Sequence, residues 1–221
     1  KVIKEQLQNT ALLSYLLYEN GKIAVDELTP DDRFGSQVNN NTALPSRSIG
    51  KSLTSYLLAH AICSGYIESV DTKLDDWNWV KGTVYEGQTL IDLVNMRAGD
   101  QEFAHTNRIF FPDKSERNIR FQPLASTYKR LKNTKPSKRF YNYNDLAVNT
   151  VTNYIRFKTG YKYQEFTTNF LQNKVGIADP FYIKAVDNMR AEMDGVEGFG
   201  ATISNFSASR YDFLRIARAM L

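Results

Sequence analysis

The stretch from Leu53 to Ile67 constrains the fold of this chain more than any other part of its 221 residues. It is rich in apolar residues and too long for an ordinary strand, so it predicts a helix that packs into a core. We expect this helix to begin near residue 48 and to end at residue 64, because Gly65 can adopt the left-handed conformation that closes many helices. With 42% hydrophobic residues, the chain can bury a substantial core within one globular domain.

The first turn of this helix carries a serine and a lysine three positions apart, Ser48 and Lys51. Residues at this spacing share one face of a helix, so the lysine amine is expected beside the serine hydroxyl. A serine becomes a strong nucleophile when an adjacent base takes its proton, and a desolvated lysine is such a base. The pair therefore predicts a nucleophile site. Ser126 and Lys129 repeat the spacing in a basic, proline-flanked stretch without an apolar helical period, and we interpret that match as coincidence.

The rest of the chain alternates between strand-like and helical segments. Asn20-Gly21 lies between two apolar runs, which is the strongest short-range indication of a β-hairpin. Thr89 and Gly99 are residue types that begin and end helices. The expected elements are helices over 1–9, 89–98, 146–158, 163–173 and 207–221 and strands over 11–18, 22–28 and 199–204, with loops over 29–47 and 100–139. This order favours a mixed sheet with a helical subdomain.

Composition argues against several classes of function. A net charge of +4 without a basic stripe argues against nucleic-acid binding, and no run reaches the roughly 18 to 20 apolar residues of a membrane helix. Cys63, the single cysteine, excludes an intrachain disulfide, and its place on the apolar helix predicts that it is buried. His60 and His105 lack further ligands at metal-binding spacing, and no phosphate-binding or dinucleotide motif is present. We therefore expect neither a metal nor a cofactor.

A series of segments along the chain carries a resemblance to a known family. The segments are the hairpin at Asn20-Gly21, the motif Ser48–Ser52, and then Gly65–Ile67, Leu74–Trp77, Thr89–Gly99, Thr159–Tyr163 and Gly198–Leu221. In their order and spacing they resemble the serine β-lactamase and penicillin-binding-protein superfamily, above all its class C-like branch of esterases, D-aminopeptidases and nylon-oligomer hydrolases. The resemblance implies an α+β fold of the α/β sandwich type, in which helices and a helical subdomain flank an antiparallel sheet. It implies a single domain over residues 1–221, with 100–139 as an insert.

In this superfamily a second motif, Tyr-x-Asn or Tyr-x-Ser, places a tyrosine beside the nucleophile. Counting back from Thr159 assigns that tyrosine to Tyr143 rather than to Tyr141, and the third position to Asp145. Asp145 departs from the family pattern, because an amide donates and accepts hydrogen bonds whereas a carboxylate accepts. A carboxylate near Lys51 favours the ammonium, which makes the lysine an electrostatic partner rather than a base. Asp145 could alternatively attract a cationic substrate group or cap the helix that follows.

The third motif of the family, Lys-Thr-Gly, lies on a strand that edges the site and supplies one N–H group of the oxyanion hole, while Ser48 supplies the other. Lys158-Thr159-Gly160 matches its letters, but we expect a helix end with a glycine cap at this point. The resemblance places the true motif beyond Leu221. We therefore expect the chain to stop before the strands that carry it.

The resemblance implies a serine hydrolase that acts through an acyl-enzyme on a small ester, amide or peptide substrate, with an esterase or amidase preferred. In that reading Ser48 attacks the carbonyl carbon, Lys51 deprotonates the serine or stabilises its anion, and Tyr143 relays protons. The alternatives are a β-lactamase, a penicillin-binding D-Ala-D-Ala peptidase, and a non-catalytic binding protein on the same scaffold. The basic segment 100–139 predicts a solvated face or a wall that selects anionic substrates. The family resemblance implies a bacterial periplasmic or secreted location, a cytoplasmic one stays open, and no oligomeric state is implied.

Overall fold

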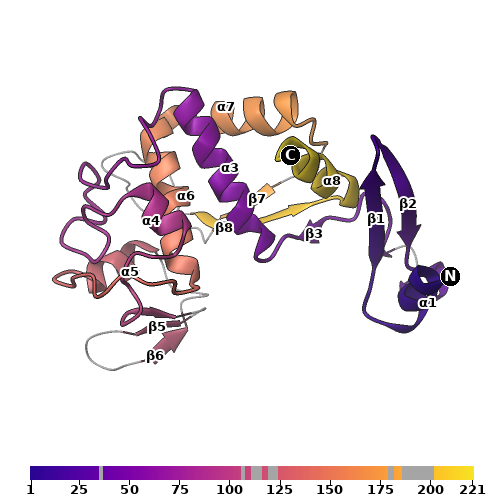
Figure 1. The fold of residues 1–221 in the computed structure, drawn as a ribbon, viewed down its shortest axis with the longest axis horizontal. Coiled ribbons are helices and arrows are strands. Elements are labelled where there is room, and N and C mark those ends of the chain that lie inside the picture. Colours follow the sequence, from indigo (N-terminus) through magenta and orange to yellow (C-terminus); the bar gives the residue numbers. More distant parts are fainter. Residues whose placement is uncertain (35–36, 106–107, 111–115, 119–123, 179–181, 186–201) are drawn as a thin grey trace. The chain divides into compact units, whose positions relative to one another are not determined.

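A computed structural model describes residues 1–34, 37–105, 108–110, 116–118, 124–178, 182–185 and 202–221 of the chain. Helices and small antiparallel sheets share these residues, which confirms the predicted α+β class (Figure 1). The chain divides into two compact units. The first comprises residues 1–47, 167–182 and 206–221, and the second comprises residues 48–166 and 183–205.

The N-terminal part of the first unit is built around a β-hairpin. Helix α1 (Val2–Asn9) precedes the strands β1 (Ser14–Glu19) and β2 (Lys22–Leu28), which pair antiparallel. Asn20 and Gly21 both have positive φ, 49° and 80°, as the tight turn between twisted strands requires. The predicted hairpin is therefore confirmed. The predicted loop over 29–47 is broken by a helical turn, α2 (Asp31–Phe34), and a short strand, β3 (Leu44–Pro45).

The C-terminal part of the first unit returns to this hairpin. The end of strand β8 (Thr202–Ala208), from Phe206 on, belongs to this unit and pairs antiparallel with β3. Helix α8 (Arg210–Ala219) follows, with the Ser209 side chain accepting from the Asp212 N–H. The buried Arg210 guanidinium pairs with Asp26 of β2 at 2.6 Å. The strand expected over 199–204 extends to Ala208, while its first three residues lie outside the described part. Strand β7 (Tyr182–Ala185) precedes them.

Two helices form the centre of the second unit. Helix α3 (Ile49–Cys63) and helix α6 (Asp145–Thr159) pack against one another, and Thr54 Oγ1 meets Thr152 Oγ1 at 3.0 Å between them. Both end as predicted at a glycine with positive φ, Gly65 at 76° and Gly160 at 54°. The side chains that α3 and α6 bury are mostly apolar, including Leu53, Leu57, Leu58, Leu146, Val151 and Ile155.

Helix α4 (Leu90–Val94) begins as predicted but ends early. The Thr89 hydroxyl accepts from the Asp92 N–H at 3.3 Å, which caps its first turn. The expected end at residue 98 is wrong, because Met96 has a φ of 52° and a left-handed residue cannot continue an α-helix. Gly99 follows, also with positive φ at 70°.

The segment 100–139 has more structure than the sequence predicts. It contains β4 (Ala104–His105), β5 (Arg108–Phe110) and β6 (Glu116–Asn118), which pair antiparallel, and helix α5 (Leu124–Arg130). Ser126 and Lys129 therefore do lie on a helix, and the expectation that none was present is wrong. Tyr128 of α5 is buried, and it shares a hydrogen bond of 2.8 Å with Thr150 of α6.

The end of α3 corrects one expectation about burial. Cys63 is exposed, because the buried face of α3 ends with Ala61. His60 lies on the side of the helix and stacks on Phe166 with ring centroids 5.2 Å apart. Phe166 belongs to α7 (Tyr163–Thr168), which continues as a π-helical turn, Asn169–Lys174, and so confirms the helix predicted over 163–173. Within the described ranges, no helix is long and apolar enough to cross a membrane.

Candidate active site

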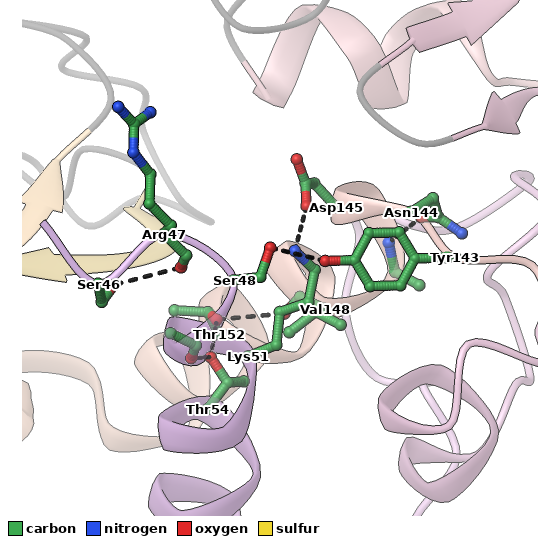
Figure 2. A network of polar contacts seen from close by, with 12 residues as sticks. Ser46, Arg47, Ser48, Lys51, Thr54, Tyr143, Asn144, Asp145, Val148 and Thr152 are labelled. Atoms are coloured by element: carbon green, nitrogen blue, oxygen red, sulfur yellow. Dashed lines mark hydrogen bonds and ion pairs between the residues drawn. The ribbon is translucent and has the colours of Figure 1, made fainter. Parts of the chain in front are cut away.

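Ser48 stands at the start of α3, where its hydroxyl is not used as a helix cap. Its backbone is already helical (φ −67°, ψ −15°), and the side chain makes no capping hydrogen bond. Instead, Ser48 Oγ accepts a hydrogen bond of 2.7 Å from the Tyr143 hydroxyl, 95 residues further along the chain (Figure 2). Ser48 is exposed, so a substrate can approach its oxygen. The residue before it, Arg47, has a φ of 51°, a left-handed conformation that non-glycine residues adopt at a cost and that clusters at functional sites.

Lys51 lies on the same face of α3 as the serine, as predicted, but its amine is engaged elsewhere. Lys51 Nζ forms an ion pair with Asp145 Oδ1 and lies 4.8 Å from the centre of the Tyr143 ring. The Lys51 side chain is 12% exposed and that of Asp145 35%, so the pair is partly shielded from water. Figure 2 shows Ser48 bonded to the tyrosine and Lys51 to the carboxylate. A lysine ammonium carries three donors and no lone pair, so in this ion pair Lys51 donates to the carboxylate and cannot take the serine proton.

The tyrosine and the aspartate come from one extended segment whose side chains alternate between two sides. Tyr141 and Tyr143 are 64% and 36% exposed, whereas Asn142 and Asn144 are 6% and 1% exposed. This period of two is that of an extended chain. It sends Tyr143 and Asp145 toward Ser48 and Lys51, and the two asparagines into the interior.

The start of α6 fixes the end of this segment. Asn144 is the N-cap residue, and its Oδ1 accepts from the Ala147 N–H at 2.9 Å. The alternative that Asp145 caps the helix is therefore wrong, because Asp145 is the first residue inside it. Its carboxylate lies in the first turn, where the helix dipole favours a negative charge. The structure places Tyr143, and not Tyr141, against the serine.

Beneath the segment lies a buried carboxylate that sequence reasoning missed, Asp100. It is fully buried and accepts hydrogen bonds from Tyr85 Oη at 2.7 Å, from Asn142 Nδ2 at 3.0 Å and from Asn144 Nδ2 at 3.2 Å. Burial, together with the neighbouring Asp100, raises the pKa of Tyr85 well above its ordinary value, so Tyr85 remains a neutral donor. The alternation of polar Asn142 and Asn144 with Tyr143 was the sequence signal that could have indicated a buried acceptor.

The literal Lys-Thr-Gly sequence lies at the end of a helix, as expected, and not on a strand. Lys158 and Thr159 are the last residues of α6, and Lys158 Nζ pairs with Asp76 at 2.9 Å. Asp76 also accepts from Tyr154 at 2.9 Å. These partners give Lys158 a role in holding α6 to the loop around residue 76. Among the described residues, no group of three or more His, Cys, Asp or Glu side chains is placed to hold a metal ion.

Comparison of the sequence with models of protein families gives no match, and comparison with curated proteins gives none either. The resemblance to the serine β-lactamase and penicillin-binding-protein superfamily therefore rests on the order and spacing of the motifs in this chain.

Proposed function

We propose that this protein is a serine hydrolase that cleaves an ester or amide bond through an acyl-enzyme, on a scaffold related to the serine β-lactamases and penicillin-binding proteins. The observation that carries the proposal is the 2.7 Å hydrogen bond between the Tyr143 hydroxyl and Ser48 Oγ, with the Lys51 ammonium 4.8 Å from the tyrosine ring. A nucleophile in hydrogen-bond contact with a proton carrier, with a cation beside that carrier, is an arrangement that can activate a serine.

In the acylation step, Ser48 Oγ attacks the carbonyl carbon of the substrate. In this step the hydrogen bond between the two hydroxyls reverses, so that the serine donates to the tyrosine. The serine proton passes to the oxygen of Tyr143 while the phenol proton passes to the leaving oxygen or nitrogen, so the bond from carbon to the leaving group breaks as the acyl-enzyme forms. Lys51, which lies 4.8 Å from the centre of the Tyr143 ring and is held there by Asp145, stabilises the negative charge that develops on these oxygens. The tyrosine is thus the proton carrier and the lysine the electrostatic partner.

Deacylation reverses the relay with water. A water molecule attacks the acyl carbon and gives its proton to Tyr143, while the phenol proton returns to Ser48 Oγ as the ester bond to the serine breaks. The exposure of Ser48 allows water to reach the acyl carbon from outside the site. No metal or organic cofactor takes part in this scheme.

The proposal is tested by intact mass after treatment with a fluorophosphonate, which reacts with activated serines. We expect one adduct on the wild-type protein and none on Ser48→Ala. Ser55→Ala is the matched control, because Ser55 is an exposed serine on the same helix, and it should label like the wild type. A folded wild-type protein that gains no adduct, or an adduct that persists in Ser48→Ala, contradicts the proposal.

The ion pair between Lys51 and Asp145 favours one second candidate, a non-catalytic binding protein on the same scaffold. A lysine paired with a carboxylate cannot take the serine proton directly. If Tyr143 does not carry that proton either, Ser48 is not activated and the protein is a non-catalytic binder. Folded wild-type protein without any adduct would favour this candidate. Where labelling occurs, parallel assays with a p-nitrophenyl ester and a chromogenic cephalosporin distinguish an esterase or amidase from a β-lactamase, and a burst without turnover indicates a penicillin-binding receptor.

A further inference from the structure

The Asp100 carboxylate is completely buried, and its described partners are neutral donors. The tyrosine hydroxyl of Tyr85 and the amides of Asn142 and Asn144 approach its two oxygens at 2.7 to 3.3 Å. A buried carboxylate is costly unless several donors satisfy it, and hydrogen bonds to a charged acceptor are the stronger kind. These donors therefore hold, and are held by, a fixed hydrogen-bond acceptor.

Two of the three donors flank Tyr143 in the sequence. Asn142 is fixed further, since its Nδ2 also donates to the Ala104 carbonyl at 2.6 Å and its backbone N–H donates to Met96 at 2.8 Å. Asn144 is fixed as well, since its Nδ2 donates to the Asn142 carbonyl at 2.9 Å while its Oδ1 caps α6. With both neighbours anchored inward, the alternation of the extended chain determines the direction in which Tyr143 points.

We infer that Asp100 is a positioning residue of the proposed hydrolase site, which sets Tyr143 against Ser48 and Asp145 against Lys51 by anchoring the two asparagines that flank Tyr143. The inference rests on the proposed function. Asp100 touches no reacting atom, and it acts on the proton relay through the backbone of residues 142–145. A displacement of about 1 Å in such a relay costs on the order of 100-fold in rate.

The test compares Asp100→Asn with Asp212→Asn. Asp212 is a matched control, because it is also fully buried, accepts a backbone hydrogen bond from Ala178 at 3.1 Å, and belongs to the first unit. Asp100→Asn keeps the size of the side chain but places an amide donor opposite other donors. Both variants should lose thermal stability. A purely structural role predicts that their labelling rates remain equal.

The kinetics of fluorophosphonate labelling at Ser48 separate positioning from stability. At saturating probe, we expect the maximal rate of Asp100→Asn to fall about 10- to 100-fold, while the probe concentration at half-maximal rate changes by less than about threefold. Asp212→Asn should keep the wild-type maximal rate. The maximal rate should change more than the half-maximal probe concentration, because Asp100 acts on the relay and not on the surface that binds the probe.

A second variant keeps the inference testable if Asp100→Asn does not fold. Asn144→Ser removes the amide that donates to Asp100 but retains a hydroxyl that can cap α6, so the helix start is preserved. We expect its maximal labelling rate to fall about tenfold. If the wild type labels and the folded Asp100→Asn and Asn144→Ser variants label at the same maximal rate, the inference is overturned and the proposed function stands. A folded wild type that does not label overturns both.

Discussion

Replacing Tyr143 by phenylalanine removes one oxygen atom, and the structure gives that atom one hydrogen bond, to Ser48 Oγ at 2.7 Å. Tyr143 is 36% exposed, and we expect its ring to keep its place against the Lys51 ammonium in the variant. We therefore expect a change in the free energy of unfolding of about 1 kcal/mol or less, which is the net value of one exposed hydrogen bond. The fold should survive, so any large loss of activity belongs to the chemical step.

The size of the rate effect distinguishes two roles for this hydroxyl. If it only orients the serine, the loss of about 1 kcal/mol slows acylation about fivefold. If it carries the proton, the loss is that of a general acid–base group, about 10²- to 10⁴-fold. We predict the larger loss, because Lys51 is occupied by Asp145 and cannot replace the tyrosine without breaking the ion pair.

The assay is the maximal rate of fluorophosphonate labelling together with the kcat for a p-nitrophenyl ester. Tyr141→Phe is the matched control, since Tyr141 is the neighbouring tyrosine on the same face of the segment and is 64% exposed. The control should stay within about twofold of the wild type, as most exposed substitutions do. A loss below about tenfold in Tyr143→Phe, with Ser48→Ala inactive, would refute the relay. A large loss in Tyr141→Phe instead would show that the motif has the other register.

Three further predictions concern the residues around the site. In a double-mutant cycle of Asp145→Asn with Lys51→Met, urea unfolding should give a coupling energy of about 1 kcal/mol, because the carboxylate is partly exposed to water; additive effects would mean that the ion pair does not form. Gly99→Ala should destabilise the protein by about 1–3 kcal/mol or more in the same assay, because φ is +70° and the added Cβ would lie 2.5 Å from a backbone oxygen; a neutral effect would contradict this geometry. Burial raises the pKa of Asp76, but hydrogen bonds, first that of Lys158, outweigh burial and lower the pKa below 3.8. The stability this provides is present above pH 3.8 and is lost as the pH falls through the folded-state pKa, so Asp76→Asn should flatten the acid limb of thermal stability against pH.

The sequence predicts those parts of the fold that are decided by a few adjacent residues. Asn20-Gly21 specifies the hairpin, Gly65 and Gly160 end the two long helices, and Thr89 begins α4, because each conformation depends on the residue type at that position. The end of α4 could not be predicted, because Met96 adopts a left-handed conformation that its own side chain disfavours. Its carbonyl accepts the Asn142 N–H at 2.8 Å, so a distant contact supports this conformation.

The candidate site divides in the same way between local and distant interactions. The spacing of Ser48 and Lys51 follows from helix geometry, so their shared face was predictable from α3 alone. The pairing of Lys51 with Asp145 was one of several alternatives, and a distance between two helix starts was needed to choose it. The role of Asp100 could not be predicted from its neighbours in the sequence, because it depends on hydrogen bonds from side chains 42 and 44 positions away.

The ion pair changes the assignment of roles that the motifs alone suggest. A serine and a lysine on one helix face favour the lysine as the base, yet the residue that contacts the serine oxygen is Tyr143, and the lysine faces a carboxylate. Because Tyr143 and Asp145 lie on one segment, a shift of that segment moves the proposed proton carrier and the counter-ion of the lysine together. The anchoring of Asn142 and Asn144 by Asp100 therefore acts on both partners of α3 at once, and in the proposed mechanism a single buried carboxylate couples the relay to its electrostatic support.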